Sequence, residues 1–221
     1  MKLYKEGISG FLWDTLCEFQ EEKLFKNYYL VGGTALSLQM GHRLSDDIDL
    51  FTEEELPKEK ILRFASRIRK NVEIINNDDT IFQIFFPTER LKVDFVKYPY
   101  ELISPLAEND CNIRMAGKDD ISAMKMSAAG TRGNEAKDFI DLFYLLKEMS
   151  VSKVVENFKR KYKTENIEHY LRSMVYFDDV SRASWDSVKM LFGKISADEV
   201  KNTLINKVTE YSKAILGIPG I

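Results

Sequence analysis

The most constraining feature of this chain is a pair of glycines, Gly32 and Gly33, that thirteen residues separate from an Asp-x-Asp motif. The short β-prone run Tyr28–Val31 leads into the glycines, and residues 34–39 after them have helical character. Because glycine lets the backbone approach a bulky group closely, a strand, a glycine turn and a helix in this order are suited to holding a large anion. The same order also suits a tight packing turn without a ligand, so the glycines alone leave both interpretations open.

The Asp-x-Asp motif consists of Asp47 and Asp49, within the predicted strand Asp47–Phe51. Alternate residues of a strand point to opposite faces, so both carboxylates lie on one face, and Ile48 and Leu50 lie on the other. Two like charges this close repel each other unless a cation lies between them, and oxygen ligands suit Mg²⁺. The motif therefore predicts metal-assisted phosphoryl or nucleotidyl transfer.

A third carboxylate, Asp94, lies in the predicted strand Leu91–Val96, on the face opposite its apolar neighbours. A charge on an otherwise apolar strand is costly to bury without a partner. If this strand neighbours Asp47–Phe51, three carboxylates converge and can hold two metal ions, one at the attacking hydroxyl and one at a triphosphate. The alternative is an edge strand on which Asp94 forms a salt bridge with Lys92 or Arg90.

The remaining hydrophobic patterns divide the chain into a mixed region and a helical region. Predicted helices cover residues 8–26, 58–70, 121–129 and 135–149, and further β-rich runs cover residues 72–75 and 81–86. Asp119 and Asp120 are predicted to cap the helix over residues 121–129. After residue 97 the β pattern disappears. The predicted fold class is mixed α+β: a small mixed sheet flanked by helices, followed by an all-helical C-terminal region.

Charge and composition exclude several classes of protein. The net charge of −3 excludes a generally basic nucleic-acid coat, although residues 150–221 carry 12 basic and 9 acidic side chains. The two cysteines and two histidines are isolated, which argues against a disulfide framework and against a histidine-based metal site. We find no pattern typical of a signal peptide or a membrane span, so a cytoplasmic protein without a membrane partner is expected.

Together these motifs resemble those of the DNA polymerase β-like nucleotidyltransferase superfamily. The sequence around them is similar to the AbiEii/AbiGii branch, which contains toxins of abortive-infection toxin–antitoxin systems. The resemblance covers about residues 28–192 and rests on residues 31–36, 41–51, 92–95, 120–128, 132–133, 137–142 and 175–179, and on Trp185. It implies a nucleotidyltransferase core domain over residues 1–110 and a helical domain over residues 111–221 that completes the active site.

The resemblance also implies roles for individual residues. The expected metal ligands are Asp47, Asp49 and Asp94. The expected catalytic residues are these three aspartates together with Lys125 and Asp138. The residues expected to bind the nucleotide are Gly32, Gly33, Thr34, Arg43, Ser45, Lys125 and Arg132. In the family, the lysine that matches Lys125 belongs to the active site.

Two pairs of residues in the helical region have alternatives that stay open. Lys125 and Arg132 share a helix face if the helix continues far enough, and the two cations would then clamp a triphosphate. Either Asp138 or Asp141 matches an aspartate that positions the lysine or acts as the base. Asp138 is preferred, because Asp141 has Lys137 four residues before it as an alternative partner.

The function implied is Mg²⁺-dependent transfer of a nucleotide from an NTP to an acceptor, with release of pyrophosphate. A two-metal site is implied, and the NTP is GTP or another nucleoside triphosphate. The implied acceptor is RNA, such as tRNA, and the implied partner is a cognate antitoxin, a DNA-binding protein encoded next to the toxin. Two alternatives share the same residues: a non-catalytic NTP-binding regulatory module, and a nucleotidyltransferase that modifies a small molecule such as an antibiotic.

Overall fold

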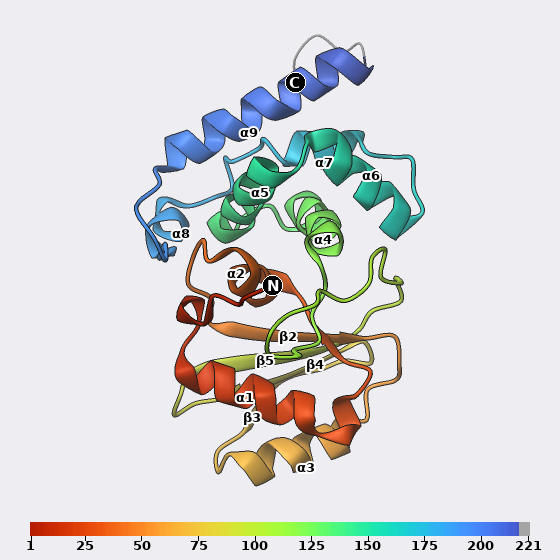
Figure 1. The fold of residues 1–221 in the computed structure, drawn as a ribbon, viewed down its shortest axis with the longest axis vertical. Helices are drawn as coiled ribbons and strands as arrows, with labels where there is room; N and C mark the ends of the chain where they lie inside the picture. Colours follow the sequence, from red (N-terminus) through yellow and green to blue (C-terminus); the bar gives the residue numbers. More distant parts are fainter. Residues whose placement is uncertain (217–221) are drawn as a thin grey trace. The chain divides into compact units, whose positions relative to one another are not determined.

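The computed structural model describes residues 1–216, and the chain folds into two compact units (Figure 1). The first unit contains Met1–Glu101 and Pro105–Ala116. The second contains Leu102–Ser104 and the chain from Gly117 onward. The division between the units therefore follows Ala116, where the sequence analysis places it at residue 110.

The first unit is built on a five-stranded mixed sheet with the strand order β1-β2-β5-β4-β3. β2 and β5 are parallel, and the other neighbouring strands are antiparallel. The strands are β1 (Tyr29–Leu30), β2 (Asp47–Thr52), β3 (Glu73–Asn77), β4 (Ile81–Phe86) and β5 (Leu91–Lys97). This sheet, with helices beside it and a helical region after it, confirms the predicted fold class. It also makes β5 an inner strand, so the alternative is wrong about an edge strand, although the salt bridge that it predicts between Asp94 and Lys92 is present.

Helices cover both faces of this sheet, with α1 and α3 on one face and α2 on the other (Figure 1). The helices are α1 (Gly10–Glu21), α2 (Gly32–Met40) and α3 (Lys58–Ile68), and the short turns η1 (Lys5–Gly7) and η2 (Lys23–Phe25) flank α1. The single helix predicted over residues 8–26 is wrong at both ends. Ser9 caps α1 by accepting from the Leu12 amide, and at Glu22 the backbone becomes extended, so that Phe25 turns inward and is fully buried.

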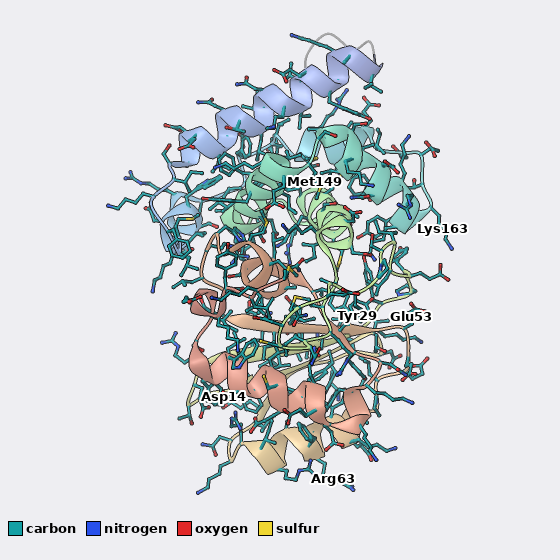
Figure 2. All side chains as sticks on the ribbon, in the orientation of Figure 1. Asp14, Tyr29, Glu53, Arg63, Met149 and Lys163 are labelled. Carbon is teal, nitrogen blue, oxygen red and sulfur yellow. The ribbon has the colours of Figure 1, made fainter. Side chains whose placement is uncertain are left out.

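Four phenylalanines fill the space between the sheet and the pair α1 and α3. Five ring pairs among Phe19, Phe25, Phe64 and Phe95 have centroids 5.1 to 5.6 Å apart, in edge-on, tilted and stacked arrangements. Such pairs add to the stability gained by burial alone. The outer sides of the two helices are polar, as the exposed Asp14 on α1 and Arg63 on α3 illustrate (Figure 2). The face of the sheet that packs against α1 and α3 is therefore the one opposite Asp94.

The second unit is all-helical from Gly117 to the end of the described chain, as predicted. Its helices are α4 (Lys118–Thr131), α5 (Ala136–Glu148), α6 (Val151–Tyr162), α7 (Glu168–Ser173), α8 (Arg182–Ser187), α9 (Ala197–Tyr211) and the π-helical turn η3 (Ser212–Leu216). Phe139, Phe143 and Phe158 are fully buried at its centre. Across residues 1–216, no helix combines the length and the apolar character needed to cross a membrane.

The cap predicted for α4 is wrong. Gly117 occupies the N-cap position without a side-chain hydrogen bond, and Asp120 lies inside the first turn, fully buried. Its two carboxylate oxygens accept hydrogen bonds from the amides of Ile103 and Ser104, at 3.0 and 3.1 Å. Asp120 therefore fastens the segment Leu102–Ser104 to the helical unit, which is why this segment belongs to that unit rather than to the sheet.

Candidate active site

The parallel pairing of β2 and β5 brings the predicted carboxylates to one face of the sheet. In the register of these strands, Asp49 lies directly opposite Asp94, and Asp47 lies opposite Lys92. Asp94 is 8% exposed, and its Oδ1 atom is buried with no hydrogen-bond partner among the described residues. The condition stated in the sequence analysis, that the strand of Asp94 neighbours Asp47–Phe51, is therefore met.

Lys92 is also part of this carboxylate group, in a position that sequence reasoning treats only as an alternative partner for Asp94. Its Nζ atom lies 2.9 Å from Asp94 Oδ2 and 4.0 Å from Asp47 Oδ2. Burial lowers the pKa of Lys92, but the hydrogen bond to Asp94 and the charges of the three carboxylates outweigh it, so the pKa lies above its ordinary value. The signal was present in the sequence, because Lys92 precedes Asp94 by two residues and so shares its face.

The three carboxylates have the chemistry of a magnesium site, although their arrangement is not that of a finished one. In the part of the chain that the structure describes, no group of three or more His, Cys, Asp or Glu side chains is arranged to hold a metal ion. The donors are nevertheless oxygens alone, on one face of neighbouring strands, and the buried Oδ1 of Asp94 has no partner. Oxygen donors with an unsatisfied buried acceptor fit a hard divalent cation.

The start of α2 lies directly against this group. The sequence pattern predicts a glycine turn before the helix. In the structure Gly32 and Gly33 are instead part of the first turn of α2. Gly32 has a φ of +69°, and a Cβ atom there would overlap the Asp49 carboxylate, while a Cβ at Gly33 would overlap the Arg43 guanidinium. The positive φ at Gly32 therefore favours glycine, and at both positions the missing Cβ allows a charged side chain to approach the backbone closely.

Hydroxyl groups connect the first turn of α2 to the start of β2. The Thr34 hydroxyl hydrogen-bonds the Ser45 hydroxyl at 2.8 Å, and it also contacts the main-chain carbonyl oxygen of Asp47. Arg43 is 4% exposed and donates to the carbonyl oxygen of Leu44. The predicted nucleotide-binding residues of the first unit thus surround the N-terminus of one helix, where unpaired amides and the helix dipole favour an anion.

Replacement of Gly32 by alanine is expected to destabilise the protein by about 1–2 kcal/mol, because a Cβ is strained at positive φ and meets the Asp49 carboxylate. Denaturant unfolding measures the loss. Gly10→Ala is the matched control, since a Cβ there meets nothing within 4 Å. Equal stability of the two variants would show that the backbone at Gly32 adapts without strain.

The helical unit holds its own buried group of charges, formed by α4 and α5. Lys125 Nζ lies 2.6 Å from Asp138 Oδ1 and 2.6 Å from Asp141 Oδ2, and all three side chains are buried. Arg132 follows the end of α4, and its Nη2 lies 2.8 Å from Asp138 Oδ2. Asp138 therefore bridges the two cations that the sequence analysis predicts as a phosphate clamp.

This arrangement changes what each member is suited to do. Burial raises the pKa of Asp138, but the charges of Lys125 and Arg132 lower it by more, so the carboxyl stays ionised and its pKa lies below its ordinary value. Asp141, which the sequence pattern ranks below Asp138, is fully buried and holds Lys125 as closely as Asp138 does. The signal for it was the i, i+3 spacing of the two aspartates, which places them on one helix face.

The chain matches known proteins along most of its length. Residues 14–206 match the family described as nucleotidyl transferase AbiEii toxin, type IV TA system. An uncharacterised protein of Aquifex aeolicus (strain VF5), aq_aa25, is 32% identical over 190 residues, which are 84% of this chain and 88% of that protein.

Solved structures share the fold at lower sequence identity. A putative nucleotidyltransferase from Helicobacter pylori has a TM-score of 0.58 and 17% identity, covering 93% of this chain and 94% of that one. MenT4, a nucleotidyltransferase toxin of Mycobacterium tuberculosis H37Rv, has a TM-score of 0.59 and 13% identity, covering 90% of this chain and 80% of its own. These two similarities show the fold alone, whereas the sequence match extends over residues 14–206. The chain belongs to the AbiEii family of nucleotidyltransferase toxins.

Proposed function

We propose that this nucleotidyltransferase uses Mg²⁺ to move a nucleotide from an NTP to RNA, with tRNA as the first acceptor to test. The observation that carries the proposal is the register of β2 and β5, which sets Asp49 opposite Asp94 on the face that Asp47 shares. Asp47, Asp49 and Asp94 would hold the metal, and three carboxylates are enough donors for a two-metal site.

The nucleotide's triphosphate would lie at the start of α2. The amides and dipole at this helix N-terminus attract an anion, and the Asp49 carboxylate and the Arg43 guanidinium lie directly beside Gly32 and Gly33. The guanidinium of Arg43, which lies against Gly33, supplies a positive charge and planar donors that match phosphate. Thr34 and Ser45 hold this turn to β2 and so fix the triphosphate relative to the carboxylates.

The transfer itself is a displacement at the α-phosphorus of the NTP. The acceptor's hydroxyl oxygen forms a bond to this phosphorus, the bond to the bridging oxygen of the β-phosphate breaks, and pyrophosphate leaves. The hydroxyl proton passes to the Asp94 carboxylate, which acts as the general base in this proposal. Bound Mg²⁺ supplies acidification of the hydroxyl and neutralisation of the triphosphate charge.

The charged group of the helical unit favours separate roles for its two cations. Two buried carboxylates already neutralise the Lys125 ammonium, so we assign Asp138 and Asp141 to positioning Lys125. The side chain of Arg132 is 53% exposed, which leaves its guanidinium better placed than Lys125 to meet a phosphate group. This assignment changes the predicted clamp in one respect: Arg132, rather than Lys125, is the cation that is open to solvent.

The RNA acceptor is proposed to bind the C-terminal half of the chain, which carries an excess of basic residues. Phe177 and Trp185 pack with Phe139 in the helical core, whereas the side chains of Tyr176 and Phe192 are exposed. Exposed aromatic rings among lysines and arginines suit the stacking of unpaired bases. Because the family consists of toxins of toxin–antitoxin systems, an antitoxin partner is expected, and we propose that it is a DNA-binding protein encoded next to this one.

Incubation of the purified protein with each α-labelled NTP, Mg²⁺ and total tRNA is expected to put label on RNA with at least one nucleotide. EDTA should abolish the transfer, because the triphosphate then lacks its counter-ion. A parallel reaction with an antibiotic mixture detects a small-molecule acceptor. Absence of label on every acceptor, with all four NTPs, would overturn the proposal, and full transfer by Lys125→Met would remove Lys125 from it.

A further inference from the structure

We propose that Lys92 is the resident counter-ion of the carboxylate group formed by Asp47, Asp49 and Asp94, and that a divalent cation binds this group by displacing the Lys92 ammonium. The inference rests on the proposed function, because it takes these carboxylates as the metal ligands. It assigns Lys92 a positioning role: the lysine keeps the carboxylates folded against the sheet until a metal arrives.

The geometry places the ammonium where a cation is needed. Lys92 and Asp94 are two residues apart on β5, so they share a face, and Lys92 pairs in register with Asp47 on β2. The Lys92 ammonium donates a hydrogen bond to Asp94 Oδ2 at 2.9 Å and lies 4.0 Å from Asp47 Oδ2. One positive charge thus bridges two of the three proposed ligands.

The pair is more than a surface salt bridge. The side chain of Lys92 is 32% exposed and that of Asp94 only 12% exposed, on an inner strand of the sheet. The Lys92 ammonium therefore neutralises part of the negative charge that these three neighbouring carboxylates bring together.

Competition follows from this arrangement. The oxygen Asp94 Oδ2 cannot give its full charge to a metal ion and to Lys92 together, so the apparent metal affinity is reduced by the fraction of protein in which the ammonium occupies the group. Removal of the ammonium should therefore strengthen metal binding and weaken the metal-free protein.

The test compares Lys92→Met, which keeps the length of the side chain without its charge, with Lys92→Arg, which keeps the charge. Lys97→Met is the matched control, because Lys97 is on the same strand and pairs with Glu55 outside the carboxylate group. Calorimetry with Mn²⁺ alone and melting in EDTA are measured for each protein. For Lys92→Met we expect a Kd for Mn²⁺ at least about tenfold lower and a Tm in EDTA about 2–4 °C lower than in the wild type. Lys92→Arg and Lys97→Met should stay close to the wild type.

Weaker or unchanged Mn²⁺ binding by Lys92→Met, with binding intact in the wild type, would overturn displacement. If neither protein binds Mn²⁺, the metal site itself fails, and the counter-ion role is then decided by melting in EDTA, where equal Tm values would overturn it. If Lys92→Met does not fold, the double variant with Asp94→Asn decides: recovery of folding supports the pair, and continued failure contradicts it.

Discussion

Asp49→Asn is expected to lower the rate of nucleotide transfer by about 10³-fold or more, while the protein stays folded. Asparagine has the shape of aspartate but removes one of the charges that would hold Mg²⁺. A bound metal contributes several kcal/mol to the stability of a transition state, and about 4 kcal/mol corresponds to 10³-fold in rate. Because Asp49 faces Asp94 across the strand pair, loss of its charge also relieves repulsion, so melting in EDTA should not fall.

Asp46→Asn is the control for this variant. Asp46 is exposed and directly precedes β2, next to the proposed metal ligand Asp47. Its replacement by asparagine removes the same charge as Asp49→Asn does. It should keep the full rate of transfer. If Asp49→Asn keeps more than about a tenth of the wild-type rate, Asp49 is not a metal ligand. If it unfolds, its inactivity has a structural cause and Asp47→Asn becomes the informative variant.

The alternation of strand residues predicted which carboxylates share a face, because the period of two is a local property of the chain. It placed Asp47 and Asp49 together and set Asp94 opposite its apolar neighbours, and the structure confirms both. It did not show that β5 is an inner strand, since α3, β3 and β4 intervene between β2 and its parallel partner. Nor did it show that Asp49, rather than Asp47, faces Asp94, which depends on register.

In the helical unit, periodicity predicted the helices, and tertiary contacts decided what their charged residues do. Helix spacing of i, i+4 predicts an ion pair between Lys137 and Asp141. In the structure, Lys125 of α4 lies 2.6 Å from the Asp141 carboxylate. A carboxylate with no exposed surface gains more from a buried ammonium than from a partner on the surface. Asp120 was misjudged for the same reason, since a helix cap is a local pattern and its actual partners are far away in the chain.

Lys161 and Asp120 form a completely buried ion pair in the helical unit. Their side chains are 1% and 0% exposed, and Nζ lies 2.7 Å from Oδ1. Asp120 also holds the amides of Ile103 and Ser104, and Arg160 donates to the carbonyl oxygen of Ile103. Loss of the lysine would leave the carboxylate charged in the helical core with only amide donors. The segment Leu102–Ser104 would then depend on an uncompensated charge.

Lys161→Met is therefore expected to destabilise the protein by about 3–5 kcal/mol, measured by denaturant unfolding. The double variant Asp120→Asn with Lys161→Met should recover part of this loss, because it removes the unpaired charge. Lys159→Met, on the same helix but at a surface ion pair with Glu165, should leave the unfolding midpoint unchanged. A loss below about 1 kcal/mol for Lys161→Met would mean that water or the helix dipole neutralises Asp120. The lysine would then not be what anchors Leu102–Ser104 to the helical unit.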